Sequence, residues 1–163
     1  MHHWNLSLIM KTTESSYNQS IERWVLDLLS KPNPAFGNLP PCPYAKKEWL
    51  SGNVDVKPFK NFVEFDKDIQ NLQKEVVIYY FDTIPLQDLQ SIVKRYNKKY
   101  RHLLFYDEHP ESEEKVAGVL LNSGIRAIIV QNRKELLEKR EELMDTEYYS
   151  NWTDDLKEKI FDR

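Results

Sequence analysis

The chain of 163 residues contains a single cysteine, Cys42, which excludes a disulfide bond within the chain. It also has only 4 glycines, which argues against a long flexible or low-complexity segment. No segment approaches the roughly 18 consecutive apolar residues that a membrane-spanning helix needs. With 40% apolar residues there is enough material for one core. We therefore expect a single domain over residues 1–163, cytoplasmic and without membrane association.

The charge balance is slightly acidic, with a net charge of −3, and gives no general attraction to nucleic acid. The only dense basic cluster covers residues 94–101, and its helical spacing predicts the solvated face and end of a helix. Residues 1–10 lack the basic start of a signal peptide, and we assign no metal site to His2 and His3. The abundance of Lys, Asn, Tyr and Ile is typical of AT-rich coding and suggests a bacterial or phage source.

Three runs of β-branched and aromatic residues predict buried strands, at residues 75–81, 102–106 and 125–130. Helices are expected between them, one from Leu86 to Tyr96 and one from Ser112 to Gly124. Strands that alternate with helices usually form parallel pairs through right-handed crossovers. The sequence therefore predicts an α/β fold with a small, mostly parallel sheet of three or four strands and helices on both faces.

The remaining segments predict the surroundings of this sheet. Apolar residues recur at helical spacing from Tyr17 to Leu29 and predict an N-terminal helix. Five prolines between residues 32 and 43 then predict a stiff loop. A strand from Val54 should lie at an edge of the sheet, because Pro58 donates no hydrogen bond to a neighbour. Further helices are expected at residues 66–74, 133–144 and 156–161.

Cys42 is a candidate for chemistry because it directly precedes a short helical segment, residues 44–50, in a proline-rich turn. Pro43 favours a helix start, and the positive helix end would favour a thiolate. Such a thiolate could serve as a nucleophile, a redox group or a metal ligand. The alternative is a small buried apolar side chain in a turn.

Polar residues follow each predicted strand: Asp82 and Thr83, then Asp107, Glu108 and His109, then Gln131 and Asn132. In a parallel sheet these ends would share one rim, where ligands gather. Two carboxylates and an imidazole could perform acid–base chemistry or bind a divalent cation. His109 precedes a proline in a loop, so its ring is expected to be exposed. The alternative is that these residues only cap the helices that follow.

Tyr148, Tyr149 and Trp152 form an aromatic cluster near the C-terminus. Such clusters usually cover the edge of a core, and some form a surface for a partner.

The segment Cys42-Pro43-Tyr44 resembles the active-site turn of glutaredoxins, in which Cys-Pro-Tyr-Cys opens a helix and the first sulfur attacks disulfides. Ala45 stands where that family has its second cysteine, and prolines stand where it has a strand. The resemblance covers about four residues and would imply at most a monothiol activity.

A second resemblance is to a bacterial family of unknown function that has an N-terminal helix, a Leu-Cys-Pro-Phe-Ala turn and a later strand ending in His-Pro. The matching features here are residues 24–29, residues 42–45 and the strand that ends in His109-Pro110. This resemblance implies no activity, but it pairs Cys42 with His109 as a thiol and an imidazole that could act together.

Two functions are compatible with these observations. One is an enzyme with an active site around Cys42, Asp82, Asp107 and His109. The other is a non-enzymatic binding or regulatory module that uses the proline-rich loop and the aromatic cluster as a partner surface. The sequence leaves open whether the ligand is a small molecule or a protein, and which cofactor, if any, is used.

Overall fold

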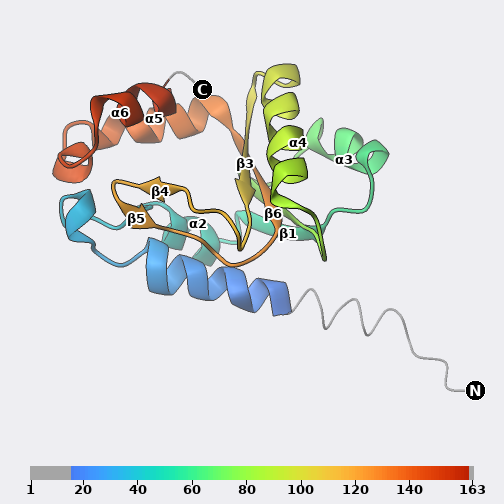
Figure 1. Ribbon diagram of the computed structural model, residues 1–163, viewed down its shortest axis with the longest axis horizontal. Helices are drawn as coiled ribbons and strands as arrows, with labels where there is room; N and C mark the ends of the chain where they lie inside the picture. The colour runs from blue at the N-terminus through green and yellow to red at the C-terminus, as the bar shows by residue number, and fades with distance from the viewer. Residues whose placement is uncertain (1–15, 162–163) are drawn as a thin grey trace, which may run out of the picture.

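The computed structural model describes residues 16–161, which form a four-stranded sheet with helices packed around it (Figure 1). After an α-helical stretch over residues 16–23, the elements in chain order are η1 (Trp24–Leu29), η2 (Pro34–Phe36), α2 (Ala45–Leu50), β1 (Val54–Pro58), α3 (Phe62–Ile69), β2 (Val76–Tyr80), α4 (Leu86–Lys99), β3 (Leu103–Glu108), β4 (Lys115–Val116), β5 (Val119–Leu120), β6 (Ala127–Asn132), α5 (Arg133–Leu143), η3 (Glu147–Tyr149) and α6 (Asp154–Phe161). The prediction on residues 1–10 lies outside the described residues.

The sheet has the order β1-β2-β6-β3 and mixed strand directions. β1 is parallel to β2, whereas β6 runs antiparallel to both of its neighbours, β2 and β3. The α/β prediction and the three buried strands are therefore confirmed. The prediction of a mostly parallel sheet is wrong, because two of the three strand pairings are antiparallel.

The segment between β3 and β6 explains this difference. The helix predicted from Ser112 to Gly124 is instead the short hairpin of β4 and β5, whose two turn residues, Ala117 and Gly118, have φ angles of 50° and 79°. A two-residue turn with positive φ at both positions joins antiparallel strands. Since no helix crosses the sheet here, the chain re-enters it at the rim that it left, and β6 runs back along β3.

One face of the sheet is covered by α3 and α4, which lie together in Figure 1. Leu89, Val93 and Tyr96 of α4 and Phe65 of α3 pack against alternate strand residues such as Phe105. α3 begins earlier than predicted, at Phe62, because the side chain of Asn61 accepts a hydrogen bond from the N–H of Glu64 and caps the helix there.

The opposite face is covered by the N-terminal helix and α2. Ile21 and Val25 pack against Ile78 of β2 and Ala127 of β6. This confirms the predicted N-terminal helix, whose last part, η1, has π-helical hydrogen bonding. β1 is an edge strand that ends at Pro58, as predicted.

A third apolar cluster lies beside the sheet and joins the proline-rich loop to the C-terminal segment. Its buried members are Phe36, Tyr148, Tyr149 and Trp152, and residues of the β4–β5 hairpin, α5 and α6 pack around them. The cluster places α5 and α6 next to the free edge of β3. Among the described residues, no helix has the length and apolar character needed to cross a membrane.

Candidate functional site

Cys42 lies at the end of the proline-rich loop, close to α5. The residue is partly exposed, and the backbone N–H groups of Tyr44 and Ala45 point at its sulfur. Burial of the sulfur nevertheless raises the pKa of the Cys42 thiol, outweighing these two amides and the positive charges of Lys139 and Arg140. The expected amide environment is present, but the prediction of a favoured thiolate is wrong because desolvation dominates.

His109 is 2% exposed, so the prediction of an exposed ring is wrong. Its Nε2 lies 2.7 Å from the carbonyl oxygen of Ile84, and the N–H of Glu111 donates to its Nδ1 at 3.1 Å. Because a backbone N–H only donates, Nδ1 carries no proton and Nε2 donates to Ile84. Both ring nitrogens therefore fix the loops at the end of β3, and neither is left to accept a proton from Cys42.

The polar strand ends are divided between two rims of the sheet. β2 and β3 run in the same direction across β6, so Asp82, which is exposed, Asp107 and His109 lie toward one rim. Gln131 and Asn132 lie at the opposite rim, because β6 runs the other way. The shared polar crevice expected of three parallel strands is therefore absent from the described part of the chain.

The aromatic cluster near the C-terminus is buried. Tyr148 and Tyr149 are each 6% exposed and Trp152 is 9% exposed, and their rings pack edge to face or tilted against one another. The hydroxyl of Tyr148 donates to the carbonyl of Pro41, which ties the cluster to the proline-rich loop. These side chains thus form a small core and offer little exposed surface to a partner.

A cavity of about 700 Å³ runs along β3, one of the two edge strands of the sheet. Residues of α4, α5, α6 and the β4–β5 hairpin are among those that line it. Figure 1 shows α4 on one side of β3 and the other three elements on its opposite side. Cys42 and Asp107 line this cavity, whereas Asp82 and His109 are not among its lining residues. Its volume falls in the range of small-molecule sites. The apolar part of its wall includes Leu136, Leu143, Tyr149, Trp152, Leu156 and Ile160.

Arg133 places a positive charge in this cavity that has no partner in the described part of the chain. It is the first residue of α5 and lines the cavity, and its three guanidinium nitrogens are shielded from solvent with no hydrogen-bond acceptor among the described residues. Burial lowers the pKa of the Arg133 guanidinium, and the positive charges of Arg101 and Arg140 lower it further. Buried charges in proteins are normally paired, so this arrangement calls for an explanation.

Arg140 lies two helical turns after Arg133 on the same side of α5. It donates one hydrogen bond to the carbonyl of Ile160 in α6, at 2.6 Å, and another to the hydroxyl of Tyr106 on β3, at 2.5 Å. Its guanidinium also lies over the Tyr106 ring, 6.0 Å from the centroid. Arg140 therefore connects the C-terminal helices to β3 across the cavity, and both of these acceptors are neutral.

The same wall holds a second hydrogen-bond donor, from Trp152. The indole Nε1 of Trp152 is buried and finds no acceptor among residues 16–161. Trp152 packs against Tyr149, whose hydroxyl donates to the carbonyl of Arg140 at 3.2 Å. The cavity thus combines apolar walls with unused hydrogen-bond donors.

The other end of the cavity is acidic and centres on Glu108, the last residue of β3. Burial raises the pKa of Glu108 to about 7, and the negative charges of Asp107 and Glu114 contribute to this increase. The N–H and the hydroxyl of Ser123 donate hydrogen bonds to Glu108 Oε2, which lower the pKa and oppose part of the increase. Glu108 therefore changes charge near neutral pH.

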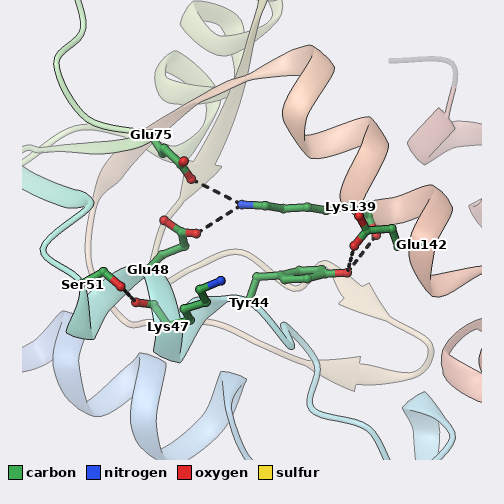
Figure 2. A network of polar contacts seen from close by, with 7 residues as sticks. All are labelled: Tyr44, Lys47, Glu48, Ser51, Glu75, Lys139 and Glu142. Atoms are coloured by element: carbon green, nitrogen blue, oxygen red, sulfur yellow. Dashed lines mark hydrogen bonds and ion pairs between the residues drawn. The ribbon is translucent and has the colours of Figure 1, made fainter.

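An ion-pair network fixes α5 against α2 beside the cavity (Figure 2). The Nζ of Lys139 lies 3.4 Å from Glu48 Oε1 and 3.4 Å from Glu75 Oε2. These two carboxylates raise the pKa of Lys139, although burial alone would lower that pKa. The hydroxyl of Tyr44 lies 3.0 Å from Glu142 Oε2. Lys139 is thus a paired cation, in contrast to Arg133.

Sequence reasoning did not identify Arg133, Arg140 or Tyr106 as functional residues, and it considered Trp152 only as part of a partner surface. A usable signal was present in the helix predicted at residues 133–144. Arg133, Leu136, Arg140 and Leu143 recur at helical spacing and line the cavity together. Two arginines on the inner face of a helix indicate a site for a negative charge, because surface arginines would lie on the opposite face.

Within residues 16–161, no three His, Cys, Asp or Glu side chains gather closely enough to hold a metal ion. Comparison of the chain with protein-family models, with curated proteins and with solved structures finds no match in any of the three. The two resemblances noted from the sequence therefore stay predictions. A function for this chain has to be argued from the site itself.

Proposed function

We propose that the protein binds a small organic anion in the cavity along β3, with Arg133 as the residue that receives the negative charge. The observation that carries this proposal is the buried guanidinium of Arg133, which has no acceptor among the described residues. A guanidinium presents a planar set of donors that matches carboxylate and phosphate groups. A binding function explains why the chain keeps such a group inside.

Energetics favour a ligand over a structural role for Arg133. A buried charge without a partner lowers the stability of the ligand-free protein by roughly several kcal/mol. A structural arginine would offset this cost with bonds to carboxylates or carbonyls, as Arg140 does with the carbonyl of Ile160. An anion in the cavity would supply the missing acceptors.

The anion reaches Arg133 by a small adjustment of the side chain. The guanidinium nitrogens are covered in the empty cavity, although the residue lines it. Arginine has four rotatable side-chain bonds, so rotation carries the guanidinium onto a ligand without movement of α5. The ligand's apolar part then packs against wall residues such as Leu136 and Trp152.

The thiol-based function receives less support. Cys42 lines the same cavity, but burial raises the pKa of its thiol. His109, the residue paired with it from the sequence, uses both ring nitrogens in other hydrogen bonds. A binding protein is thus the function that the geometry supports best.

The test is a titration followed by NMR. The protein is titrated with phenyl phosphate and, separately, with benzoate, while the Nε–Hε signal of Arg133 and the indole signal of Trp152 are observed. We expect at least one of these anions to shift both signals with saturation. In R133M the shift of the Trp152 signal should be lost.

The matched control is K134M, which removes the exposed positive charge next to Arg133 on the same helix. It should bind as the wild type does. If neither anion shifts the two signals, or if R133M binds as tightly as K134M, the proposal is overturned.

A further inference from the structure

We infer that the bound anion is a doubly charged phosphate monoester with an apolar or aromatic substituent, an inference that rests on the proposed function. Phosphate monoesters carry close to two negative charges at neutral pH, whereas carboxylates and sulfate esters carry one. The charges, hydrogen bonds and wall chemistry of the cavity each favour the dianion.

The positive charges around Arg133 exceed what a single negative charge would neutralise. Arg101, just before β3, and Arg140, on α5, are close enough for their charges to repel that of Arg133. The cavity wall also includes Lys98 and Lys159. A dianion offsets the repulsion within this group more completely than a monoanion does.

Carboxylates within residues 16–161 do not pair with these arginines. All five ion pairs among residues 16–161 use lysine, and none uses Arg101, Arg133 or Arg140. Lys139, by contrast, is a paired cation, because Glu48 and Glu75 both form ion pairs with its Nζ. Within the described residues the charges of the three arginines are therefore not neutralised by an ion pair, although Arg101 and Arg140 donate hydrogen bonds to neutral oxygens.

The acidic end of the cavity lies apart from the arginines. Arg101 precedes β3 and Glu108 ends it, and a strand of this length spans roughly 17 Å at about 3.4 Å per residue. Asp107 and Glu114 also lie toward Glu108, since their charges act on its pKa. A phosphate at Arg133 is thus placed away from the carboxylates.

The rest of the ligand should be apolar. The wall near the arginines includes the partly exposed side chains of Leu136 and Leu143 on α5 and of Leu156 and Ile160 on α6. An inorganic ion would leave this surface in contact with water, whereas a phenyl or similar group covers it and gains about 25 cal/mol per Å² of apolar surface removed from water.

The experiment compares three probes by calorimetry at pH 8 and fixed ionic strength: phenyl phosphate, phenyl sulfate and inorganic phosphate. The first two have nearly the same shape and differ by one charge. We expect phenyl phosphate to bind at least ten times more tightly than phenyl sulfate, and also more tightly than inorganic phosphate. R133M should lose at least tenfold in affinity for phenyl phosphate, and K134M should not.

The outcomes separate the two proposals. Equal binding of phenyl phosphate and phenyl sulfate, with both dependent on Arg133, overturns the dianion and leaves an anion-binding protein. Inorganic phosphate binding as tightly as phenyl phosphate overturns the ester. If none of the three binds while benzoate shifts the Arg133 signal, the phosphate inference falls and the proposed function stands. If benzoate also fails, both fall.

Discussion

Glu108 shows how a single residue responds to its place in the fold. It ends β3 as a partly buried side chain, and desolvation of the carboxyl group raises its pKa to about 7. An ordinary carboxyl group ionises near pH 4.5. Between these values the folded protein holds a proton that the unfolded chain has released, so stability falls as the pH rises through this range.

We predict that E108Q removes this pH dependence. The wild type should lose stability relative to E108Q between pH 5.5 and pH 8, with a slope of at most ~1.4 kcal/mol per pH unit from this group. The measurement is the free energy of unfolding in urea at both pH values. The control, E113Q, changes an exposed carboxylate nearby and should track the wild type. The prediction is contradicted if the difference in unfolding free energy between E108Q and the wild type is the same at pH 5.5 and pH 8.

At the same scale, the sequence identified the right residue types at the ends of strands but not their roles. His109 was expected to be exposed because a proline follows it, yet the loop after β2 brings the Ile84 carbonyl to its ring. That contact joins residues 25 positions apart, and no local pattern encodes it. For Cys42, the local sequence predicts the backbone amides that surround the sulfur, but it does not predict the burial of the sulfur by segments distant in the chain.

At the scale of the element, β3 is an edge strand whose backbone is partly paired by a side chain. Asn97 of α4 donates to the carbonyl of Phe105 at 2.9 Å and accepts from its N–H at 2.8 Å. The amide of Asn97 thus occupies the place of a neighbouring strand. Exposed strand edges invite pairing with other chains, and this clamp opposes it.

N97A should destabilise the protein by about 2 kcal/mol, because two backbone groups of Phe105 lose their partners. Hydrogen exchange at the Phe105 amide should accelerate by more than the global loss of stability explains. S91A, on the exposed face of α4, serves as the control and should stay within about 0.5 kcal/mol of the wild type. Unchanged exchange at Phe105 in N97A would show that Asn97 is not the clamp.

The contact between η2 and η3 depends on a glycine. Gly37 has a φ angle of +64°, and a Cβ at this position would lie 2.1 Å from the carbonyl oxygen of Glu147. G37A therefore combines backbone strain with a collision against η3. Gly52 has a similar φ of +72°, but a Cβ there would meet nothing within 4 Å, so G52A isolates the strain.

We expect G52A to cost about 1 kcal/mol and G37A at least about 2 kcal/mol more, because the aromatic cluster must shift. Urea unfolding of both variants measures the difference. Equal costs for the two substitutions would mean that the approach of η2 to η3 does not matter for stability.

The elements themselves were largely predictable. Runs such as residues 75–81 predict strands because apolar β-branched and aromatic side chains persist over strand length, and this holds for β2, β3 and β6. The β4–β5 hairpin was missed because Val116, Val119 and Leu120 also fit helical spacing. The turn at Gly118 decides between helix and hairpin.

At the scale of the whole molecule, that one hairpin sets the direction of β6 and so the position of the site. With β6 antiparallel, α5 begins at the rim where β3 starts, and the N–H of Arg133 donates to the carbonyl of His102, just before β3. A helical crossover would have placed α5 at the other rim. The candidate site could not be located from the sequence because it depends on this reversal and on the packing of α5 and α6 beyond the sheet edge.

The most direct test of the account is the free energy of unfolding of R133M without ligand, in a chloride buffer free of phosphate and sulfate. If Arg133 is kept for an anion, the empty protein gains by its removal, and R133M should be more stable than the wild type by about 1–3 kcal/mol, with K134M unchanged within about 0.5 kcal/mol. If R133M is instead less stable than K134M by about 1 kcal/mol or more, Arg133 is a structural residue and the account is contradicted.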